Sequence, residues 1–130
     1  MANKMSAVIV MGLVIISLIC VASAISGTAT YYTVYTPSAC YGYQDEGTMI
    51  AAASEAIYAN GAACGKMYKI TCTGATNNGV TQPCKGGSVT VKIVDLCPSP
   101  GCQATFDLSQ EAFSAIANTD AGKIQIDYTL

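Results

Sequence analysis

The sequence predicts a small, mostly β domain that is braced by disulfides and exported from the cell. The chain has 130 residues with seven cysteines and no histidine. Its N-terminal segment is apolar and uncharged over residues 7–22. Downstream, short segments rich in Thr, Val, Ile and Tyr alternate with loops rich in Gly, Asn and Pro, as in small β-domains. We therefore expect one domain in which disulfides supplement a modest hydrophobic core.

The N-terminus has the features of a secretory leader. Lys4 supplies a positive charge before the apolar run, and Ala22-Ser23-Ala24 matches the small-residue pattern of a signal peptidase site. The alternative is a retained membrane anchor, but a spanning helix needs about 20 apolar residues. We therefore predict a signal peptide over residues 1–24, a mature domain over residues 25–130, and no stable membrane insertion.

Removal of this leader makes the number of cysteines even, because Cys20 lies inside it. An even set in a short exported chain indicates a disulfide framework, although spacing alone does not choose the pairing. The alternative is a zinc site, which the absence of histidine and of any Cys-x-x-Cys pair disfavours. The remaining six are Cys40, Cys64, Cys72, Cys84, Cys97 and Cys102.

Charge excludes one large class of function. Without Lys4 the domain has five lysines, eight carboxylates and no arginine, which gives a side-chain charge of −3. A nucleic-acid-binding protein needs a basic face, which this composition does not provide. No acidic calcium loop or phosphate-binding loop is visible in the sequence. We expect a monomer without cofactor or metal.

Four segments have the composition or alternation of strands. The clearest is 88–95, where Val89, Val91 and Ile93 alternate with Thr90 and Lys92. The strands are predicted over 27–35, 66–72, 88–95 and 123–128.

Two segments favour helices. Residues 48–59 are rich in alanine, and Met49, Ala53 and Ile57 recur at four-residue spacing, which indicates one or two helical turns. Residues 108–118 predict a second helix with Ser109 as its N-cap, and with Phe113, Ile116 and Ala117 on its buried side. Short strands with one or two short helices suggest a small barrel.

Five short runs, taken in order, resemble a known family. Together they are similar to the N-terminal domain of expansins, to the domain of family-45 endoglucanases and, most closely, to the plant natriuretic peptide proteins. The runs are Thr28-Ala29-Thr30-Tyr31-Tyr32, Asn60-Gly61-Ala62-Ala63-Cys64-Gly65, Val91-Lys92-Ile93-Val94-Asp95-Leu96-Cys97-Pro98, Thr105-Phe106-Asp107-Leu108-Ser109 and Ala112-Phe113.

The resemblance implies a fold and a disulfide pairing. The fold is a six-stranded double-psi β-barrel with one or two short helices, without a carbohydrate-binding second domain. The implied pairs are Cys40–Cys64, Cys72–Cys84 and Cys97–Cys102.

The resemblance also implies a groove around Asp107, which matches the catalytic acid of the related endoglucanases. Their base lies just beyond the first strand, where this chain has Thr33-Val34-Tyr35 and no carboxylate. Glycoside hydrolysis normally needs two carboxylates, so Asp107 is a vestigial acid and hydrolysis is disfavoured. The structural alternative for Asp107 is helix capping. Thr30, Tyr32 and Asp95 are further groove candidates, although Asp95 also suits loop amides and the other two suit strand packing.

By resemblance, the leading hypothesis is a non-enzymatic apoplastic signalling protein that acts in water and ion homeostasis through a cell-surface receptor. The corresponding segment is 37–66, with Tyr41, Gln44, Asp45, Glu46 and Glu55 as receptor candidates. The second hypothesis is a wall-polysaccharide-binding or loosening protein that uses the Asp107 groove, or a transglycosylase with one catalytic carboxyl. Thr105 replaces the histidine that expansins carry before Phe-Asp, which argues against expansin-type loosening. A third hypothesis is a barwin-like defence protein.

Overall fold

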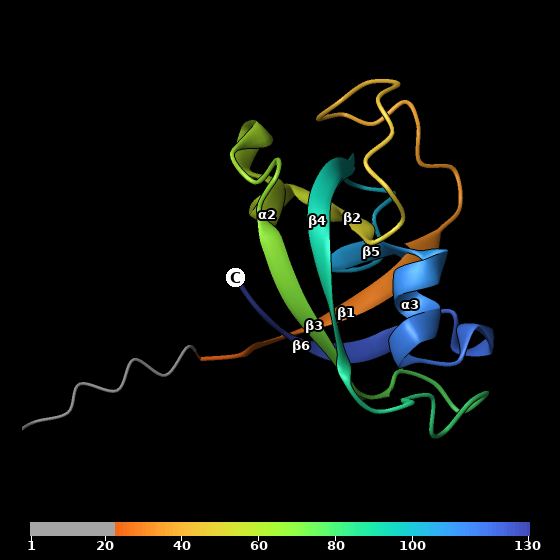
Figure 1. Ribbon diagram of the computed structural model, residues 1–130. Coiled ribbons are helices and arrows are strands. Elements are labelled where there is room, and N and C mark those ends of the chain that lie inside the picture. The colour runs from red at the N-terminus through yellow and green to blue at the C-terminus, as the bar shows by residue number, and fades with distance from the viewer. Residues whose placement is uncertain (1–22) are drawn as a thin grey trace, which may run out of the picture.

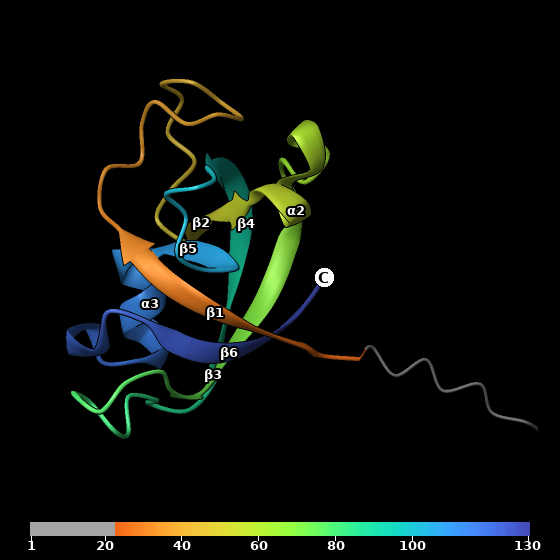
Figure 2. The ribbon, with the colours of Figure 1, turned by 180° about the vertical axis from the view of Figure 1, so that it is seen from behind.

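Six strands close into a barrel in the computed structural model, which describes residues 23–130 (Figures 1 and 2). Residues 1–22 of the leader predicted over 1–24, including Cys20, lie outside the described residues. The ring order is β1-β5-β2-β4-β3-β6. Along the chain the elements are β1 (Ile25–Tyr32), β2 (Ile50–Ser54), α2 (Glu55–Tyr58), η1 (Ala59–Gly61), β3 (Met67–Ala75), β4 (Ser88–Cys97), β5 (Phe106–Ser109), α3 (Gln110–Ile116), η2 (Thr119–Ala121) and β6 (Ile124–Thr129).

The ring combines parallel and antiparallel pairs. Strand β1 runs parallel to β5, and β2 runs parallel to β4, while the other four neighbouring pairs are antiparallel. Both parallel pairs join strands that are distant in the sequence. This confirms the double-psi β-barrel that the resemblance implies.

Aromatic rings fill one end of the core. The Phe106 side chain is fully buried, and its ring centroid lies 5.2 Å from that of Tyr68 and 5.0 Å from that of Tyr128. Beside the barrel, α3 covers the ends of β1 and β5 (Figure 1). Its Phe113 packs against Tyr31, with ring centroids 4.9 Å apart. These contacts seal the side of the barrel that α3 covers.

The prediction of a helix over 48–59 is wrong in its first half. Residues Ile50–Ser54 form strand β2, and the α-helix that follows has a single turn, Glu55–Tyr58. Strand β2 lies between β4 and β5, where Ala51 and Ala53 are fully buried. Backbone pairing with β4 and β5 on both sides outweighs the helical propensity of alanine, which is a weak preference that tertiary contacts override.

The helix predicted over 108–118 begins later, because residues Phe106–Ser109 form strand β5. Ser109 is confirmed as the N-cap, since its Oγ accepts a hydrogen bond of 3.0 Å from the backbone N–H of Ala112. The predicted burial of Phe113, Ile116 and Ala117 is also confirmed.

The four predicted strands exist, with shifted ends. The first ends at Tyr32 instead of residue 35, so Thr33-Val34-Tyr35 belongs to the following loop. The second continues to Ala75, because β6 pairs with it from Lys69 to Ala75. No helix within residues 23–130 is long and apolar enough to cross a bilayer.

Three disulfides brace the loops, and they join the pairs that the resemblance implies. Cys40–Cys64 ties the loop after β1 to the turn after η1. Cys72–Cys84 ties β3 to the loop before β4, and Cys97–Cys102 closes the loop after β4. In a domain with a modest core, each such bridge typically contributes about 2–4 kcal/mol.

Replacing Phe106 with Ala is expected to lower the free energy of unfolding by about 3–5 kcal/mol, because it opens a cavity among the rings of Tyr68 and Tyr128. Denaturant unfolding of the oxidised protein measures this. The control is Tyr43→Ala, whose side chain is 82% exposed and whose loss should change stability by less than about 0.5 kcal/mol. Equal effects of the two substitutions would contradict this account of the core.

Candidate functional site

One row of side chains crosses four neighbouring strands on the outside of the barrel. Thr30 on β1 pairs with Asp107 on β5, and Asp107 pairs with Ala52 on β2. Ala52 pairs in turn with Asp95 on β4. The chain neighbours of Asp107, Phe106 and Leu108, are fully buried, so Asp107 points away from the core. The fold therefore places the two carboxylates, 12 positions apart in the sequence, on one surface.

Ala52 lies between these two carboxylates. Its side chain is a methyl group that is only 3% exposed, so neighbouring groups cover β2 between Asp107 and Asp95. Neighbouring strands lie about 4.8 Å apart, so the two aspartates are roughly 9–10 Å apart at their Cα atoms. A β-bulge in the β2–β4 pairing falls between Ala51 and Ala52 and sets Asp95 opposite Ala52. The result is a polar row with a carboxylate on either side of Ala52, at the place where the resemblance implies the groove.

Asp107 has the environment of a proton donor. Burial raises the pKa of its carboxyl, and the charge of Asp95 raises this pKa further, while the hydrogen bond from Thr30 opposes the shift. In that bond the Thr30 hydroxyl donates to Asp107 Oδ1 over 2.8 Å. The capping role considered for Asp107 is wrong, because Ser109 caps α3 and Asp107 lies within β5.

Asp95 is held by the backbone on both sides. Its Oδ1 accepts hydrogen bonds from the N–H groups of Ala39 at 2.8 Å and Leu96 at 2.9 Å. The predicted contact of Asp95 with loop amides is therefore confirmed, while its role in a groove stays a prediction. Nearby, the Cys40 N–H donates to the Val94 carbonyl over 3.0 Å, so the loop after β1 is fixed against this edge of the groove.

Tyr32 supplies a phenol without a partner. Its hydroxyl is buried, and it is the one buried side-chain polar atom that lacks a hydrogen bond within residues 23–130. Burial raises the pKa of Tyr32, and the charges of Asp95 and Asp107 raise it further, so the phenol is neutral. Tyr32 lies two residues beyond Thr30 on β1, on the same side of the strand. It can therefore donate one hydrogen bond and accept another at the groove.

The position just beyond β1 carries no carboxylate. Val34 there is 75% exposed. Asp45 and Glu46, the nearest acidic residues in sequence, are engaged elsewhere. Asp45 Oδ1 accepts from the Gly47 N–H over 2.8 Å, and Glu46 forms an ion pair of 2.5 Å with Lys92. The hydrogen bond from Lys92 lowers the pKa of Glu46.

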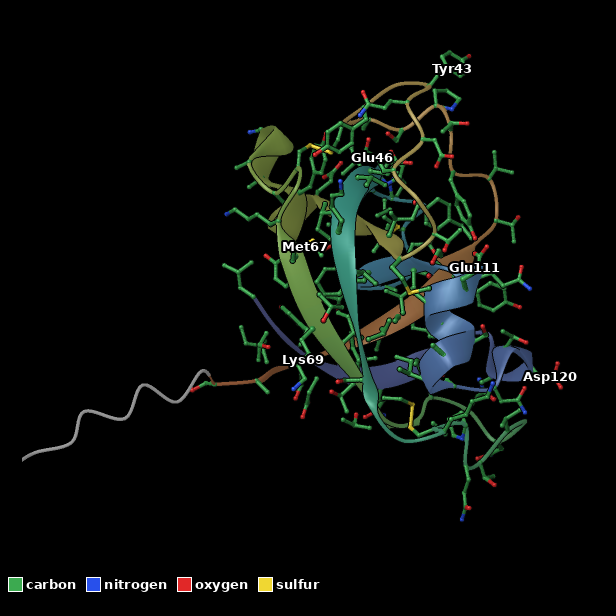
Figure 3. All side chains as sticks on the ribbon, viewed as in Figure 1. Tyr43, Glu46, Met67, Lys69, Glu111 and Asp120 are labelled. Atoms are coloured by element: carbon green, nitrogen blue, oxygen red, sulfur yellow. A yellow bond between two sulfur atoms is a disulfide. The ribbon has the colours of Figure 1, made fainter. Side chains whose placement is uncertain are left out.

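The receptor candidates do not converge on one point. The Gln44 amide donates to Glu46 Oε2 over 2.6 Å, and Tyr41 lies under Lys92, with the ammonium 5.4 Å from the ring centroid. Glu55 belongs to α2 and accepts a hydrogen bond of 3.4 Å from the Ser99 N–H, away from this loop. The sequence analysis missed Tyr43, which projects from the tip of the loop (Figure 3).

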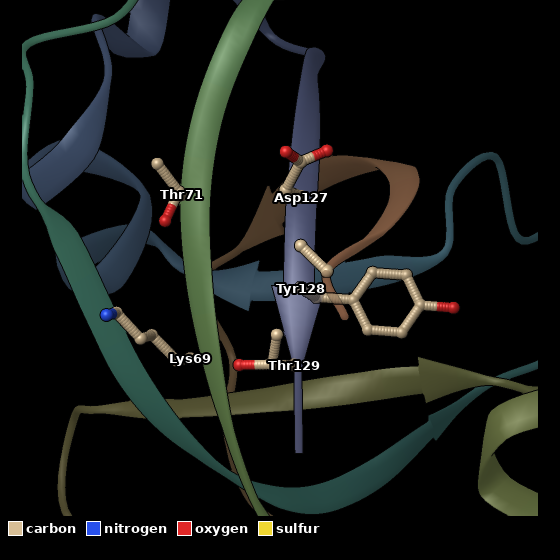
Figure 4. Close-up of a pocket in the computed structure, with 6 residues that line it drawn as sticks. Lys69, Thr71, Asp127, Tyr128 and Thr129 are labelled. Carbon is tan, nitrogen blue, oxygen red and sulfur yellow. The ribbon is translucent and has the colours of Figure 1, made fainter. Parts of the chain in front are cut away.

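A second hollow lies over β3 and β6, on a different face of the barrel (Figure 4). Lys69, Thr71, Asp127 and Thr129 line it with solvated polar groups, and Ala24, which precedes the predicted cleavage point, completes it. It contains one carboxylate, so it does not reproduce the paired arrangement of the groove. No group of three or more metal-ligating side chains gathers among the described residues.

Comparison with known proteins shows the family of this chain. The family model described as lytic transglycolase, whose model name denotes the double-psi β-barrel, matches residues 50–128. A protein of Citrus jambhiri, named EG45-like domain containing protein, is 67% identical over 108 residues, which are 82% of each chain. The chain belongs to the EG45-like domain family.

Solved expansins share the fold of this EG45-like chain. The expansin of Clavibacter michiganensis superposes with a TM-score of 0.64 at 30% identity, over 83% of this chain and 50% of the expansin. A variant of that expansin in complex with cellohexaose superposes with a TM-score of 0.60 at 28% identity. The EG45-like chain thus spans half of the expansin structure that it matches.

Replacing Asp107 with Asn is expected to stabilise the EG45-like domain at pH 7. The raised pKa of Asp107 means that folding disfavours its ionised form, and Asn removes this penalty while keeping the acceptor for Thr30. As the pH rises from the ordinary aspartate pKa of about 3.9 to the raised pKa of folded Asp107, the unfolding free energy of the unmodified protein decreases. It stays lower at higher pH. The advantage of Asn should therefore vanish below about pH 3.9.

Melting temperatures of the two proteins from pH 3 to pH 8 test this expectation, because the other carboxylates titrate in both. A difference in melting temperature that does not change with pH would contradict the assignment to Asp107.

Proposed function

We propose that this chain is an extracellular, expansin-like protein that holds a cell-wall polysaccharide in the Asp107 groove without cleaving it. The observation that carries the proposal is the convergence of Thr30, Asp107 and Asp95 in one row beside the unpartnered hydroxyl of Tyr32. The predicted leader over 1–24 supports export to the wall.

The chemistry of the groove suits a sugar chain. Sugar hydroxyls donate and accept hydrogen bonds, and the groove offers carboxylates as acceptors together with a phenol that does both. The cellohexaose complex of the related expansin supports an extended glucan as ligand. The row of Thr30, Asp107 and Asp95 lies on the exterior of the barrel, which allows a long chain to pass across it.

Binding without cleavage is expected because no second carboxylate stands where the base of a hydrolase would lie. Hydrolysis needs an acid and a base on opposite sides of the sugar. Asp107 fits the acid, but Val34 occupies the region where the resemblance expects the base. Asp95 is anchored through Oδ1 by two backbone N–H groups, which suits a fixed ligand contact. The raised pKa of Asp107 favours one catalytic alternative, a transglycosylase with a single carboxyl.

The purified, oxidised domain is expected to bind cellohexaose and xyloglucan in calorimetric titrations, and Asp107→Ala should weaken this binding at least about tenfold. Asp127→Ala is the matched control, because Asp127 lies at the hollow over β3 and β6 and its loss should leave affinity unchanged. Product analysis should find no new reducing ends and no transglycosylation products. Turnover of any glycan that Asp107→Ala abolishes would disprove binding without cleavage.

We propose, as a second candidate, recognition by a cell-surface receptor of the type that the natriuretic-peptide resemblance implies, with a role in water and ion homeostasis. The observation that favours it is the loop over 36–49, which Cys40–Cys64 and the Glu46–Lys92 ion pair brace against the barrel. The loop presents Tyr43 with 82% of its surface exposed. A rigid loop with an exposed aromatic side chain is suited to binding a protein partner.

If the loop is recognised, the protein should swell plant protoplasts, and Tyr43→Ala should reduce the response at least about fivefold, because the exposed ring is the contact. Asp107→Ala, which alters the groove alone, should swell protoplasts as the unmodified protein does. Loss of swelling with Asp107→Ala, but not with Tyr43→Ala, would instead assign the response to the groove.

A further inference from the structure

We infer that the groove continues beyond Asp107 across Tyr32 and Tyr35 to Glu111, so that it binds several consecutive neutral sugar residues of one chain. The inference deepens the proposed function and rests on it. It assigns Tyr35 as a stacking platform and Glu111 as a hydrogen-bond acceptor.

Contact between two tyrosines makes the groove continuous. The rings of Tyr32 and Tyr35 meet edge to face, with centroids 5.2 Å apart and an interplanar angle of 83°. Tyr32 lies close enough to Asp95 and Asp107 for their charges to act on its hydroxyl, and Tyr35 acts on that hydroxyl from the other side. Polar and aromatic groups therefore follow one another without a break from Asp95 to Tyr35.

The hydroxyl of Tyr35 is anchored to the start of α3. It accepts a hydrogen bond of 3.1 Å from the Gln110 N–H and donates one to Glu111 Oε1. In Figure 3, Glu111 lies at the end of α3 that faces the loop after β1. Because the ring is fixed at its edge by Tyr32 and at its hydroxyl by α3, a bound sugar would immobilise little that is not already ordered.

A surface hollow lies where this extension ends. Its lining consists wholly of side chains with a hydroxyl, amide or carboxylate group, namely Thr33, Tyr35, Gln110, Glu111 and Ser114. Hydrogen-bonding groups beside an aromatic ring, whose face is apolar, match the two surfaces of a sugar. No local sequence pattern predicts this cluster, because 76 positions separate Tyr35 from Glu111.

Charge decides which sugars fit. Asp95, Asp107 and Glu111 give the extended groove three carboxylates. Lys92 is neutralised by its ion pair with Glu46, whereas Lys85, which donates to the Ser114 carbonyl over 2.7 Å, adds one positive charge at the hollow and leaves the carboxylates in excess. A polymer of uronic acids would be repelled along the groove, whereas a neutral glucan would not.

The test is a calorimetric series with the oxidised domain and cello-oligosaccharides of two to six units. Affinity should rise with length up to cellohexaose, and Tyr35→Ala should remove that gain, which lowers the affinity for cellohexaose about tenfold while cellobiose binds as before. Tyr43→Ala is the control, because it removes an exposed tyrosine outside the groove. Tyr35→Phe keeps the ring without the anchoring hydroxyl and should show an intermediate loss.

Equal affinity of Tyr35→Ala and the unmodified protein for cellohexaose would overturn the extension while leaving the Asp107 groove in place. Binding of an oligogalacturonate of six units as tightly as cellohexaose would overturn the preference for neutral sugars. Failure of the unmodified protein to bind any member of the series would instead overturn the proposed function, and the extension with it. Unchanged melting temperatures of the variants exclude misfolding as the cause of a loss.

Discussion

The site depends on the pairing of β5 with its two neighbouring strands in the ring. Strand β5 has only four residues, Phe106–Ser109, yet it pairs with β1 on one side and β2 on the other. Its alternation buries Phe106 and Leu108 and turns Asp107 outward. The ring that buries Phe106 therefore also sets Asp107 beside Thr30, so a loss of core packing at this strand would displace the carboxylate.

The disulfides act on the loops more than on the barrel. Cys40–Cys64 holds the loop whose Ala39 N–H binds Asp95, so this bridge fixes one side of the groove without taking part in it. Ten of the twelve largest fully buried side chains among the described residues, including Ile70, Ile124 and Ile126, lie on strands that form the barrel wall. Oxidation and core packing thus have separate roles: the core forms the ring, and the bridges hold its loops in place for binding.

Much of the architecture was accessible from the sequence, and the reasons for the exceptions are physical. Alternation of Val89, Val91 and Ile93 predicted β4, because a side-chain period of two is a local signal. The alanines of β2 led to the wrong prediction of a helix, because their strand conformation depends on pairing with β4 and β5, which lie far away in the sequence. The resemblance supplied four groove candidates, namely Thr30, Tyr32, Asp95 and Asp107. Only the strand register shows that they face one surface. Tyr35 and Glu111 had no sequence signal, because a long-range hydrogen bond is what joins them.

The environment that raises the pKa of Asp107 suits the binding of a sugar as well as acid catalysis. A carboxyl that burial keeps protonated to higher pH donates a hydrogen bond to a sugar oxygen as readily as it would protonate a leaving group. What separates the two outcomes is a base that activates water, and the exposed Val34 in the loop after β1 cannot fill that role. In the proposed extension, Tyr35 and Glu111 supply further contacts to the bound chain. An active-site geometry of this kind can therefore become a binding groove through the loss of one group, with the strands that position the rest unchanged.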